Sequence, residues 1–195
     1  MTRIIAGTAR GRRLAVPPGE GTRPTSDRAR EALFSALDAQ LNGFQGLRVL
    51  DLYAGSGAVG LEALSRGASR AMLVEYDRKA AAVIGKNVAA SGLSGAVVVN
   101  DRAERLLGAP RADGGPYDLV FIDPPYALPD EDVREVLTLL DGELWLKAGA
   151  VVVLERSARD EPFAWPDAYE ATRDKAYGEA RMLYAVWYGL GATEQ

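Results

Sequence analysis

The sequence predicts an α/β fold, in which a mostly parallel β-sheet is covered by helices on both faces. Short apolar segments, such as residues 47–50, 71–75 and 118–122, alternate along the chain with segments of helical periodicity. Strands that alternate with helices indicate parallel pairing, because each helix returns the chain to the same edge of the sheet. The length of 195 residues fits one domain with a small extension.

The expected elements of the main body follow in chain order. Ser26 is a favourable N-cap for a helix that ends near Leu41, before Asn42 and Gly43. Beyond this helix we expect strands at residues 47–50, 71–75, 96–100, 118–122 and 150–155. A helix that ends at Arg66 follows the first of these strands, and further helices cover residues 78–90, 101–107 and 130–140.

Both ends of the chain are expected to form hairpins. Two short strands at residues 3–6 and 13–16 predict a small N-terminal β-hairpin, and residues 17–21 form a linker. Two strands around Tyr177 and Gly178 predict a C-terminal antiparallel hairpin that closes the sheet. We therefore divide the chain into a basic hairpin with its linker (residues 1–21) and a main domain (residues 22–190).

The composition excludes several kinds of chemistry. The chain contains no histidine and no cysteine, so it lacks imidazole acid–base groups, thiolate nucleophiles and the usual zinc ligands, and we expect no metal. The longest apolar run, residues 148–154, is far shorter than the roughly 18 residues of a membrane span. No export signal is apparent, so we expect a cytoplasmic protein without a membrane partner.

Charge is distributed unevenly along the chain. The net charge is −4, yet residues 1–30 carry seven arginines against two carboxylates, which leaves −9 on the remainder. Such a basic segment on an acidic body suits contact with a polyanion such as RNA, and Arg10, Arg12 and Arg13 are the candidate contacts. A solvated terminus without a partner explains the charge equally well.

A glycine motif follows the first strand of the main domain. Gly55, Gly57 and Gly60 have GxGxxG spacing at the start of a helix, and Glu75 ends the next strand, where a carboxylate can bind a ribose diol. Both a dinucleotide and S-adenosylmethionine fit such a turn. Asp51, just before it, favours S-adenosylmethionine, because an acid attracts the ammonium group of that cofactor and repels a pyrophosphate.

A second motif, Asp123, Pro124, Pro125 and Tyr126, follows the strand at residues 118–122. The prolines fix a rigid turn without N–H donors, so backbone carbonyls stay available beside the Asp123 carboxylate. Two acceptors and the flat face of Tyr126 suit an exocyclic amine on a planar base. This motif therefore predicts a site at which an amino group is the methyl acceptor.

These motifs carry a resemblance to a known family. Residues 51–60, Glu75, Asp101 and residues 123–126 resemble the class I S-adenosylmethionine-dependent methyltransferases of the amino-methylating (D/N)PP(Y/F) group. Residues 3–7, 11–14 and 22–34, with Tyr177 and Gly178, narrow this to the bacterial 16S ribosomal RNA guanine-N2 methyltransferase family. The resemblance covers about residues 3–188 and implies the Rossmann-like class I methyltransferase fold.

The resemblance also implies roles for individual residues. Glu75 would hold the ribose, Asp101 and the backbone N–H of Arg102 the adenine, and Arg23 and Thr25 the methionine end. The full set of cofactor-binding candidates is Arg23, Thr25, Asp51, Tyr53, Gly55, Ser56, Gly57, Glu75, Tyr76, Asp101, Arg102 and Asp123. The catalytic candidates are Asp123, Pro124, Pro125 and Tyr126, and Tyr126 would also contact RNA.

The expected activity is methylation of guanine N2 in 16S ribosomal RNA, with S-adenosyl-L-homocysteine as the second product. The partner would be that RNA within the small ribosomal subunit or an assembly intermediate, and the protein would act as a monomer. Three alternatives stay open: an aminomethyltransferase of DNA, of another RNA or of protein glutamine; an NAD-dependent oxidoreductase; and a non-catalytic RNA-binding module.

Overall fold

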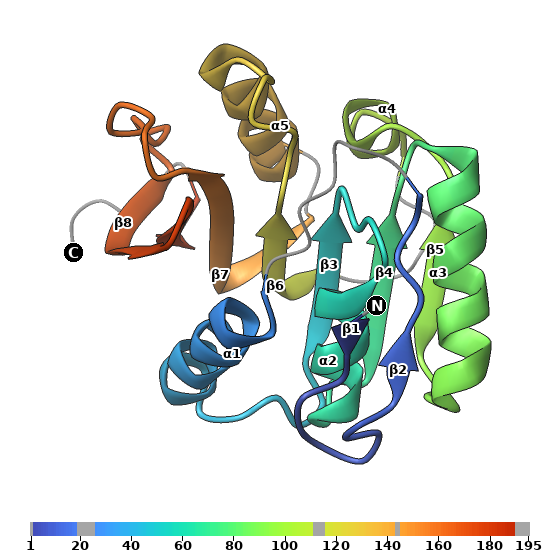
Figure 1. The fold of residues 1–195 in the computed structure, drawn as a ribbon. Coiled ribbons are helices and arrows are strands. Elements are labelled where there is room, and N and C mark those ends of the chain that lie inside the picture. The colour runs from blue at the N-terminus through green and yellow to red at the C-terminus, as the bar shows by residue number, and fades with distance from the viewer. Residues whose placement is uncertain (1, 19–25, 111–115, 143–144, 190–195) are drawn as a thin grey trace.

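The structure is a computed structural model that describes residues 2–18, 26–110, 116–142 and 145–189 (Figure 1). Its elements, in chain order, are β1 (Thr2–Arg3), β2 (Arg13–Leu14), α1 (Asp27–Leu41), β3 (Arg48–Leu52), α2 (Ala58–Ser65), β4 (Arg70–Val74), α3 (Arg78–Ser91), β5 (Ala96–Val99), α4 (Ala103–Leu107), β6 (Tyr117–Ile122), α5 (Asp130–Gly142), β7 (Leu146–Ser157), β8 (Tyr169–Tyr177) and β9 (Ala180–Trp187). Among the described residues, no helix is long and apolar enough to cross a lipid bilayer.

The predicted fold class is confirmed. Seven strands form one sheet in the order β5-β4-β3-β6-β7-β9-β8, and the first five of these are parallel to one another. β9 pairs antiparallel with β7 and with β8, so the C-terminal hairpin closes the sheet as expected. The order reverses between β3 and β6, and the carboxyl ends of these two neighbours meet at one edge. Ligands of open parallel sheets bind at such a reversal.

Two hydrophobic cores lie on the two faces of the sheet. Because side chains of a strand alternate between faces, Leu50 and Leu52 of β3 belong to one core and Val49 to the other. The first core packs against α4 and α5, and the second against α1, α2 and the N-terminal hairpin. Helices on both faces were predicted, and Figure 1 shows them on either side of the strands.

The local signals for α1 act as the sequence predicts. The Ser26 hydroxyl accepts a hydrogen bond from the backbone N–H of Ala29 (3.1 Å), and Asn42 ends the helix in the left-handed conformation. These contacts satisfy backbone groups that a helix leaves without partners at its ends. The helix consequently presents Leu33, Phe34 and Leu37 to the second core.

The N-terminal hairpin is smaller than expected and is packed firmly on α2. Its ladder contains only the pairs Thr2 with Leu14 and Arg3 with Arg13. The fully buried Glu62 of α2 accepts hydrogen bonds from the backbone N–H groups of Ile5 (2.7 Å) and Ala6 (3.0 Å), and from the Nε of Arg66 (2.8 Å).

The turn of the hairpin contacts the C-terminal end of α2. The backbone N–H of Thr8 donates to the carbonyl of Ser65 (2.8 Å), and that of Ala9 donates to the Ser65 hydroxyl (2.9 Å). A side chain at Gly7 would overlap the Ser65 carbonyl oxygen. This close approach of two backbones explains the glycine, which also has a positive φ of 79°.

Candidate active site

The glycine motif forms a tight turn between β3 and α2. Gly55 and Gly57 have φ angles of 57° and 78°, and Tyr53 has a φ of 61°. The left-handed region is open to glycine without a steric penalty, which explains the two glycines. The Tyr53 hydroxyl donates to Glu104 of α4 (2.9 Å), so the side chain of this residue is anchored beyond the turn.

Asp51 lies at the carboxyl end of β3, with 2% of its surface exposed. Its Oδ2 accepts a hydrogen bond from the backbone N–H of Gly60 (2.9 Å), near the start of α2. Burial, aided by the charge of Glu75 and opposed by the Gly60 bond, raises the pKa of Asp51 to about 7. Among the residues that the structure describes, no cation pairs with Asp51, and a buried carboxyl group of this kind is a suitable receptor for a ligand ammonium.

Glu75 joins the glycine turn to the segment before α3. Its Oε2 accepts from the backbone N–H of Gly55 and its Oε1 from that of Asp77, each at 2.9 Å. Each carboxylate oxygen has capacity for a second hydrogen bond, so the group can also accept from ribose hydroxyls. The sequence predicts Glu75 only as a ligand contact. The structure shows that Glu75 also accepts a hydrogen bond from the Gly55 backbone.

The two residues predicted for adenine, Asp101 and Arg102, lie after β5, and the cofactor candidate Tyr76 lies after β4. Asp101 Oδ1 accepts from the backbone N–H of Arg102 (2.8 Å), and the Arg102 guanidinium lies 5.7 Å from the ring centre of the exposed Tyr76. Asn100, which sequence reasoning missed, donates to the carbonyls of Glu75 (2.8 Å) and Tyr76 (2.9 Å). These hydrogen bonds connect the segment after β5 to the segment after β4, beside the glycine turn.

The residues 123–126 turn lies next to the glycine turn. Leu52 of β3 pairs with Ile122 of β6, and the backbone N–H of Asp123 donates to the Leu52 carbonyl (3.3 Å). Burial, together with the negative charges of Glu155 and Asp51, raises the pKa of Asp123 well above its ordinary value. Three carboxyl groups therefore lie close together where β3, β6 and β7 end.

The two prolines differ in their surroundings. Pro124 is buried and Pro125 exposed, and the Pro125 carbonyl accepts from the backbone N–H of Leu128 (2.8 Å). The sequence predicts free carbonyls on this turn, but the one at Pro125 closes a turn instead. Within the described residues, the Pro124 carbonyl accepts no hydrogen bond, so this oxygen and Asp123 are the pair of acceptors suited to an amine.

Tyr126 contacts a residue that sequence reasoning missed. Its hydroxyl donates to Oε1 of Glu155 (3.2 Å), at the end of β7. The tyrosine is 41% exposed, whereas Glu155 is 3% exposed. Burial and the charge of Glu155 raise the pKa of the Tyr126 hydroxyl. One signal could have found Glu155, because it is a carboxylate at the end of a strand predicted to reach this edge of the sheet.

Asn87 of α3 is another missed residue. Its Oδ1 accepts from the backbone N–H of Ala15 (2.8 Å), and its Nδ2 donates to the carbonyls of Ala15 (2.9 Å) and Ser56 (2.8 Å). Asn87 is 3% exposed. The segment after the N-terminal hairpin is thus hydrogen-bonded, through one side chain, to the residue between the two turn glycines.

The three arginines predicted to contact RNA belong to the N-terminal hairpin and to neither motif turn. Arg10, Arg12 and Arg13 are exposed, and Arg10 follows the hairpin turn that contacts the C-terminal end of α2. The glycine turn precedes the other end of this helix, so the structure does not bring Arg10 to the carboxyl edge of the sheet. Arg23 and Thr25 lie outside the described residues.

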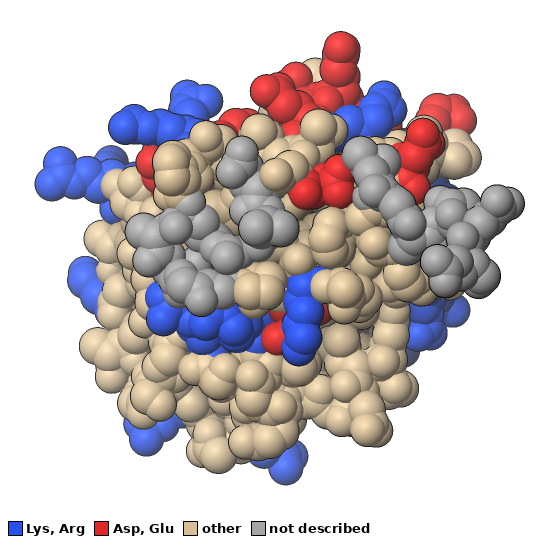
Figure 2. Space-filling model, turned by 180° about the vertical axis from the view of Figure 1, so that it is seen from behind, with Lys and Arg blue, Asp and Glu red and all other residues tan. Residues whose placement is uncertain are grey.

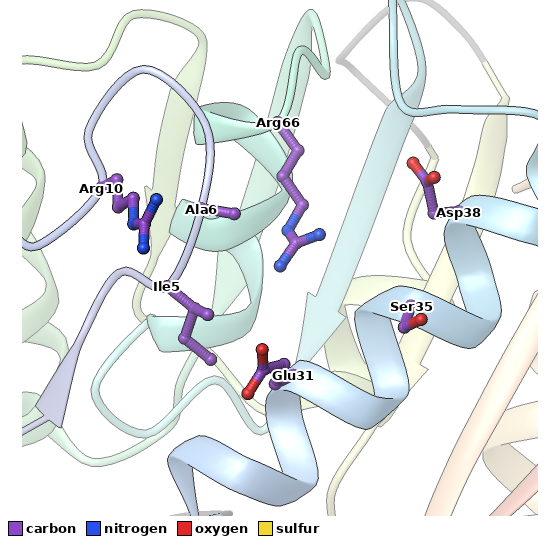
Figure 3. A pocket seen from close by; sticks show the side chains of 7 residues that line it. All are labelled: Ile5, Ala6, Arg10, Glu31, Ser35, Asp38 and Arg66. Atoms are coloured by element: carbon purple, nitrogen blue, oxygen red, sulfur yellow. The ribbon is translucent and has the colours of Figure 1, made fainter.

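Arg10 lines a hollow of about 420 Å³ between the hairpin and α1. Figure 3 shows the guanidinium of Arg66 in this space, with Glu31 and Asp38 on the α1 side. Because both signs of charge line the hollow, it is not a basic surface. Figure 2, which views the molecule from behind relative to Figure 1, shows acidic side chains gathered at the top of the face, and basic side chains at its upper left and below its centre.

Comparisons with known proteins relate the chain to several bacterial relatives. Ribosomal RNA small subunit methyltransferase D from Escherichia coli K12 is 39% identical over 183 residues, which cover 93% of this chain and 88% of the relative. The protein of the same name from Haemophilus influenzae is 35% identical over 178 residues, covering 90% and 89%.

Solved structures of methyltransferases are also similar to this chain. The Escherichia coli protein yhhF, 35% identical, superposes with a TM-score of 0.81 over 97% of this chain and 99% of its own. Magnesium protoporphyrin IX methyltransferase from Synechocystis PCC 6803, solved with bound S-adenosylmethionine, is 16% identical and covers 82% and 78% with a TM-score of 0.64, which shows the shared fold alone.

A family model covers almost the entire chain. The model described as "Conserved hypothetical protein 95" matches residues 2–186. This range contains both motif turns, the N-terminal hairpin and all but the last residue of the C-terminal hairpin. The chain therefore belongs to the conserved hypothetical protein 95 family.

Proposed function

We propose that this protein uses S-adenosylmethionine to methylate the N2 amine of a guanine in 16S ribosomal RNA. One observation carries the proposal: the pairing of β3 with β6 brings the glycine turn and the residues 123–126 turn to one edge of the sheet. The names of the Escherichia coli and Haemophilus influenzae relatives support small-subunit ribosomal RNA as the substrate.

The residues around the glycine turn fit the cofactor. S-adenosylmethionine, when bound, supplies an activated methyl group on a cationic sulfur. Asp51 would attract its ammonium, and Glu75 would accept from its ribose hydroxyls while holding the Gly55 backbone. Asp101, Arg102 and Tyr76 would contact the adenine. The candidates for the ammonium, the ribose and the adenine thus lie at the carboxyl ends of the neighbouring strands β3, β4 and β5, in the order of these parts along the ligand.

The residues of the second turn would hold the acceptor base. Asp123 and the Pro124 carbonyl would accept hydrogen bonds from the two N–H groups of the guanine N2 amine, and Tyr126 would stack on the ring. The new bond joins N2 to the methyl carbon, so N2 gains positive charge and must lose a proton to Asp123 or to water. A carboxylate at this position interacts more strongly as that charge develops, which is the differential stabilisation that catalysis requires.

The base must leave its stack to reach this turn, because a paired guanine does not expose its amine to a pocket at the edge of a sheet. Arg10, Arg12 and Arg13 would contact phosphates of the same RNA, away from the reacting base. We propose the small ribosomal subunit or an assembly intermediate as the partner, and a monomeric enzyme. The oxidoreductase alternative loses support, because the named relatives are methyltransferases.

The decisive experiment is methyl transfer from labelled S-adenosylmethionine to small ribosomal particles from a strain that lacks this enzyme. We expect incorporation into 16S ribosomal RNA, with N2-methylguanosine as the only labelled nucleoside after digestion. Label in another nucleoside would disprove the guanine assignment, and the lack of any label would disprove the activity. DNA of the same strain serves as the alternative substrate and should remain unlabelled.

A further inference from the structure

Three acidic side chains lie close together at the carboxyl edge of the sheet. In the ladder, Asp51 pairs with Phe121 and Phe121 with Val153. Asp123 and Glu155 each lie two residues beyond these partners. Since side chains repeat every two residues along a strand, Asp51 and Glu155 point to the face that carries α1 and α2. Asp123 directly follows β6, and its carboxyl group interacts electrostatically with both of them. Glu155 is therefore a neighbour of the proposed catalytic carboxylate.

Glu155 also determines how the tyrosine of the turn is held. The Tyr126 hydroxyl donates to the Glu155 carboxylate (3.2 Å), and the acceptor is 3% exposed whereas the tyrosine is 41% exposed. The hydroxyl end is thus fixed against the sheet while the rest of the side chain reaches the surface. An exposed tyrosine on a loop otherwise exchanges between staggered side-chain rotamers.

Arg156, the next residue, contacts the same loop from the other face of the sheet. Its Nη2 donates to the carbonyl of Leu128 and to Oδ1 of Asp130, each at 2.9 Å. Arg156 is 5% exposed. Two consecutive residues of β7 therefore contact this loop: Glu155 contacts the last residue of the residues 123–126 turn, and Arg156 contacts the segment that follows it.

We propose that Glu155 is a positioning residue of the methyl-acceptor site, which fixes the Tyr126 ring in the orientation that receives the base. This inference rests on the proposed function for its kinetic consequence, but the contact itself can be tested without activity. Glu155 does not touch the base. It acts through Tyr126, and a restrained ring loses less conformational entropy when the base stacks on it.

The first measurement is NMR of the full chain with ring-labelled tyrosine, in which the Tyr126 signal is assigned from a Tyr126→Phe variant. We expect one side-chain rotamer in the wild type and averaging over rotamers in Glu155→Ala. Glu155→Gln keeps an acceptor oxygen and should restore the single rotamer. The same distribution of Tyr126 rotamers in the wild type and in Glu155→Ala would overturn the inference, whatever the protein catalyses.

The second measurement is a double-mutant cycle on single-turnover methylation of 16S ribosomal RNA. Loss of a hydrogen bond to a charged group corresponds to about a tenfold fall in rate or more. We expect this fall in Glu155→Ala and in Tyr126→Phe, no further fall when the two are combined, and recovery in Glu155→Gln. Fully additive effects would show that Glu155 does not act through Tyr126.

Two controls separate the possible failures. Glu170→Gln changes an exposed carboxylate on β8 and should leave both the Tyr126 signal and the rate unchanged. Cofactor affinity, measured by calorimetry, should stay within about twofold in Glu155→Ala, because Glu155 lies outside the glycine turn. If the wild type labels no RNA, the proposed function fails, and the NMR measurement still decides whether Glu155 positions Tyr126.

Discussion

The carboxylate of Glu75 accepts a hydrogen bond from the backbone N–H of Gly55 at 2.9 Å, which links the end of β4 to the turn after β3. The residue proposed to bind the ribose therefore also holds the turn proposed to approach the methionine part of the cofactor. One substitution at this position should affect both contacts.

Glu75→Ala should weaken S-adenosylmethionine binding by about 10- to 150-fold, because a hydrogen bond to a charged group contributes about 1.5–3 kcal/mol. Calorimetry on the purified variant measures this directly. Glu135→Ala, which removes an exposed carboxylate of α5, is the matched control and should bind normally. Unchanged affinity in a folded Glu75→Ala protein would refute the ribose assignment.

Asp123→Ala should lower the methylation rate by about 10²–10³-fold, as expected when one preorganised polar group of an active site is removed. Cofactor affinity should change little, because Asp123 would contact the acceptor amine. Single-turnover assays and calorimetry on the same preparation separate the two effects. A near-normal rate in this variant would contradict the proposed role of Asp123.

The raised pKa of Asp123 predicts a pH dependence. A carboxyl group accepts a proton only when it is ionised, so the rate should rise with pH through this pKa. The acid limb should lie well above pH 4, near which an ordinary aspartate titrates. Asp123→Asn retains an acceptor oxygen but cannot ionise, and should be slower without that limb. A limb that persists in Asp123→Asn would belong to another group, such as Asp51.

Asp51→Asn should make stability less dependent on pH. The Asp51 carboxyl titrates at about 7 in the folded chain and at 3.8 without its surroundings. Between these values the folded state retains a proton that the unfolded state releases, so rising pH destabilises the wild type, by at most about 1.4 kcal/mol for each pH unit. Asparagine removes this loss and can still accept from the Gly60 N–H.

Urea unfolding of wild type and Asp51→Asn at about pH 5 and about pH 8 measures the effect. The variant should gain stability relative to the wild type as pH rises, and the difference between the two proteins cancels the titration of groups that do not interact with Asp51; Glu75 and Asp123 do interact with it. A difference that does not depend on pH would show that Asp51 is ionised throughout this range.

Replacing Arg10, Arg12 and Arg13 together by glutamine should weaken RNA binding and reduce its salt dependence. Each lost phosphate contact should lower the slope of log affinity against log salt by about 0.7–0.9. Anisotropy titrations at several salt concentrations provide both quantities. Cofactor affinity should not change, because the hairpin turn contacts the far end of α2 from the glycine turn.

A matched triple variant tests whether the salt dependence of RNA binding depends on the position of the arginines or only on the net charge of the protein. Arg159, Arg173 and Lys175 are exposed on the strands of the C-terminal part of the sheet or next to them. Their replacement by glutamine removes the same charge and should leave the slope close to that of the wild type. Equal slopes for the wild type and the hairpin variant would favour a solvated terminus without an RNA contact.

Gly7→Ala should be more destabilising than Gly11→Ala. Both glycines have similar positive φ angles, 79° and 82°, so the strain of alanine in this region, about 1–2 kcal/mol, is common to both variants. A Cβ at Gly7 would overlap the Ser65 carbonyl, whereas one at Gly11 meets no atom within 4 Å. The difference between the two unfolding free energies therefore reports the contact between the hairpin and α2.

If the two variants unfold at the same urea concentration, the hairpin does not depend on that contact. If Gly7→Ala is less stable, as expected, its RNA salt slope should also fall, because the arginines after the turn would no longer be held on α2. Gly11→Ala should retain the wild-type slope.

The sequence identifies the two turns of the candidate site because their signals are local. The glycines at positions 55 and 57 satisfy a backbone conformation within their own turn, and the two prolines restrict theirs. The alternation of strands and helices then requires parallel pairing, and the carboxyl ends of neighbouring parallel strands meet at one edge. The order of β3 and β6 confirms that both turns lie there.

The contacts that hold this site in place could not be inferred from local patterns, although its position at the end of a predicted strand marks Glu155 as a candidate. Tyr126 and Glu155 are 29 positions apart, Ala15 and Asn87 are 72 apart, and Ile5 and Glu62 are 57 apart. Each of these contacts depends on strand register and on how a helix packs, and neither leaves a signal in the neighbouring residues. A buried glutamate or asparagine has the same local sequence whether or not a distant partner reaches it, so the folded chain alone assigns these residues their roles.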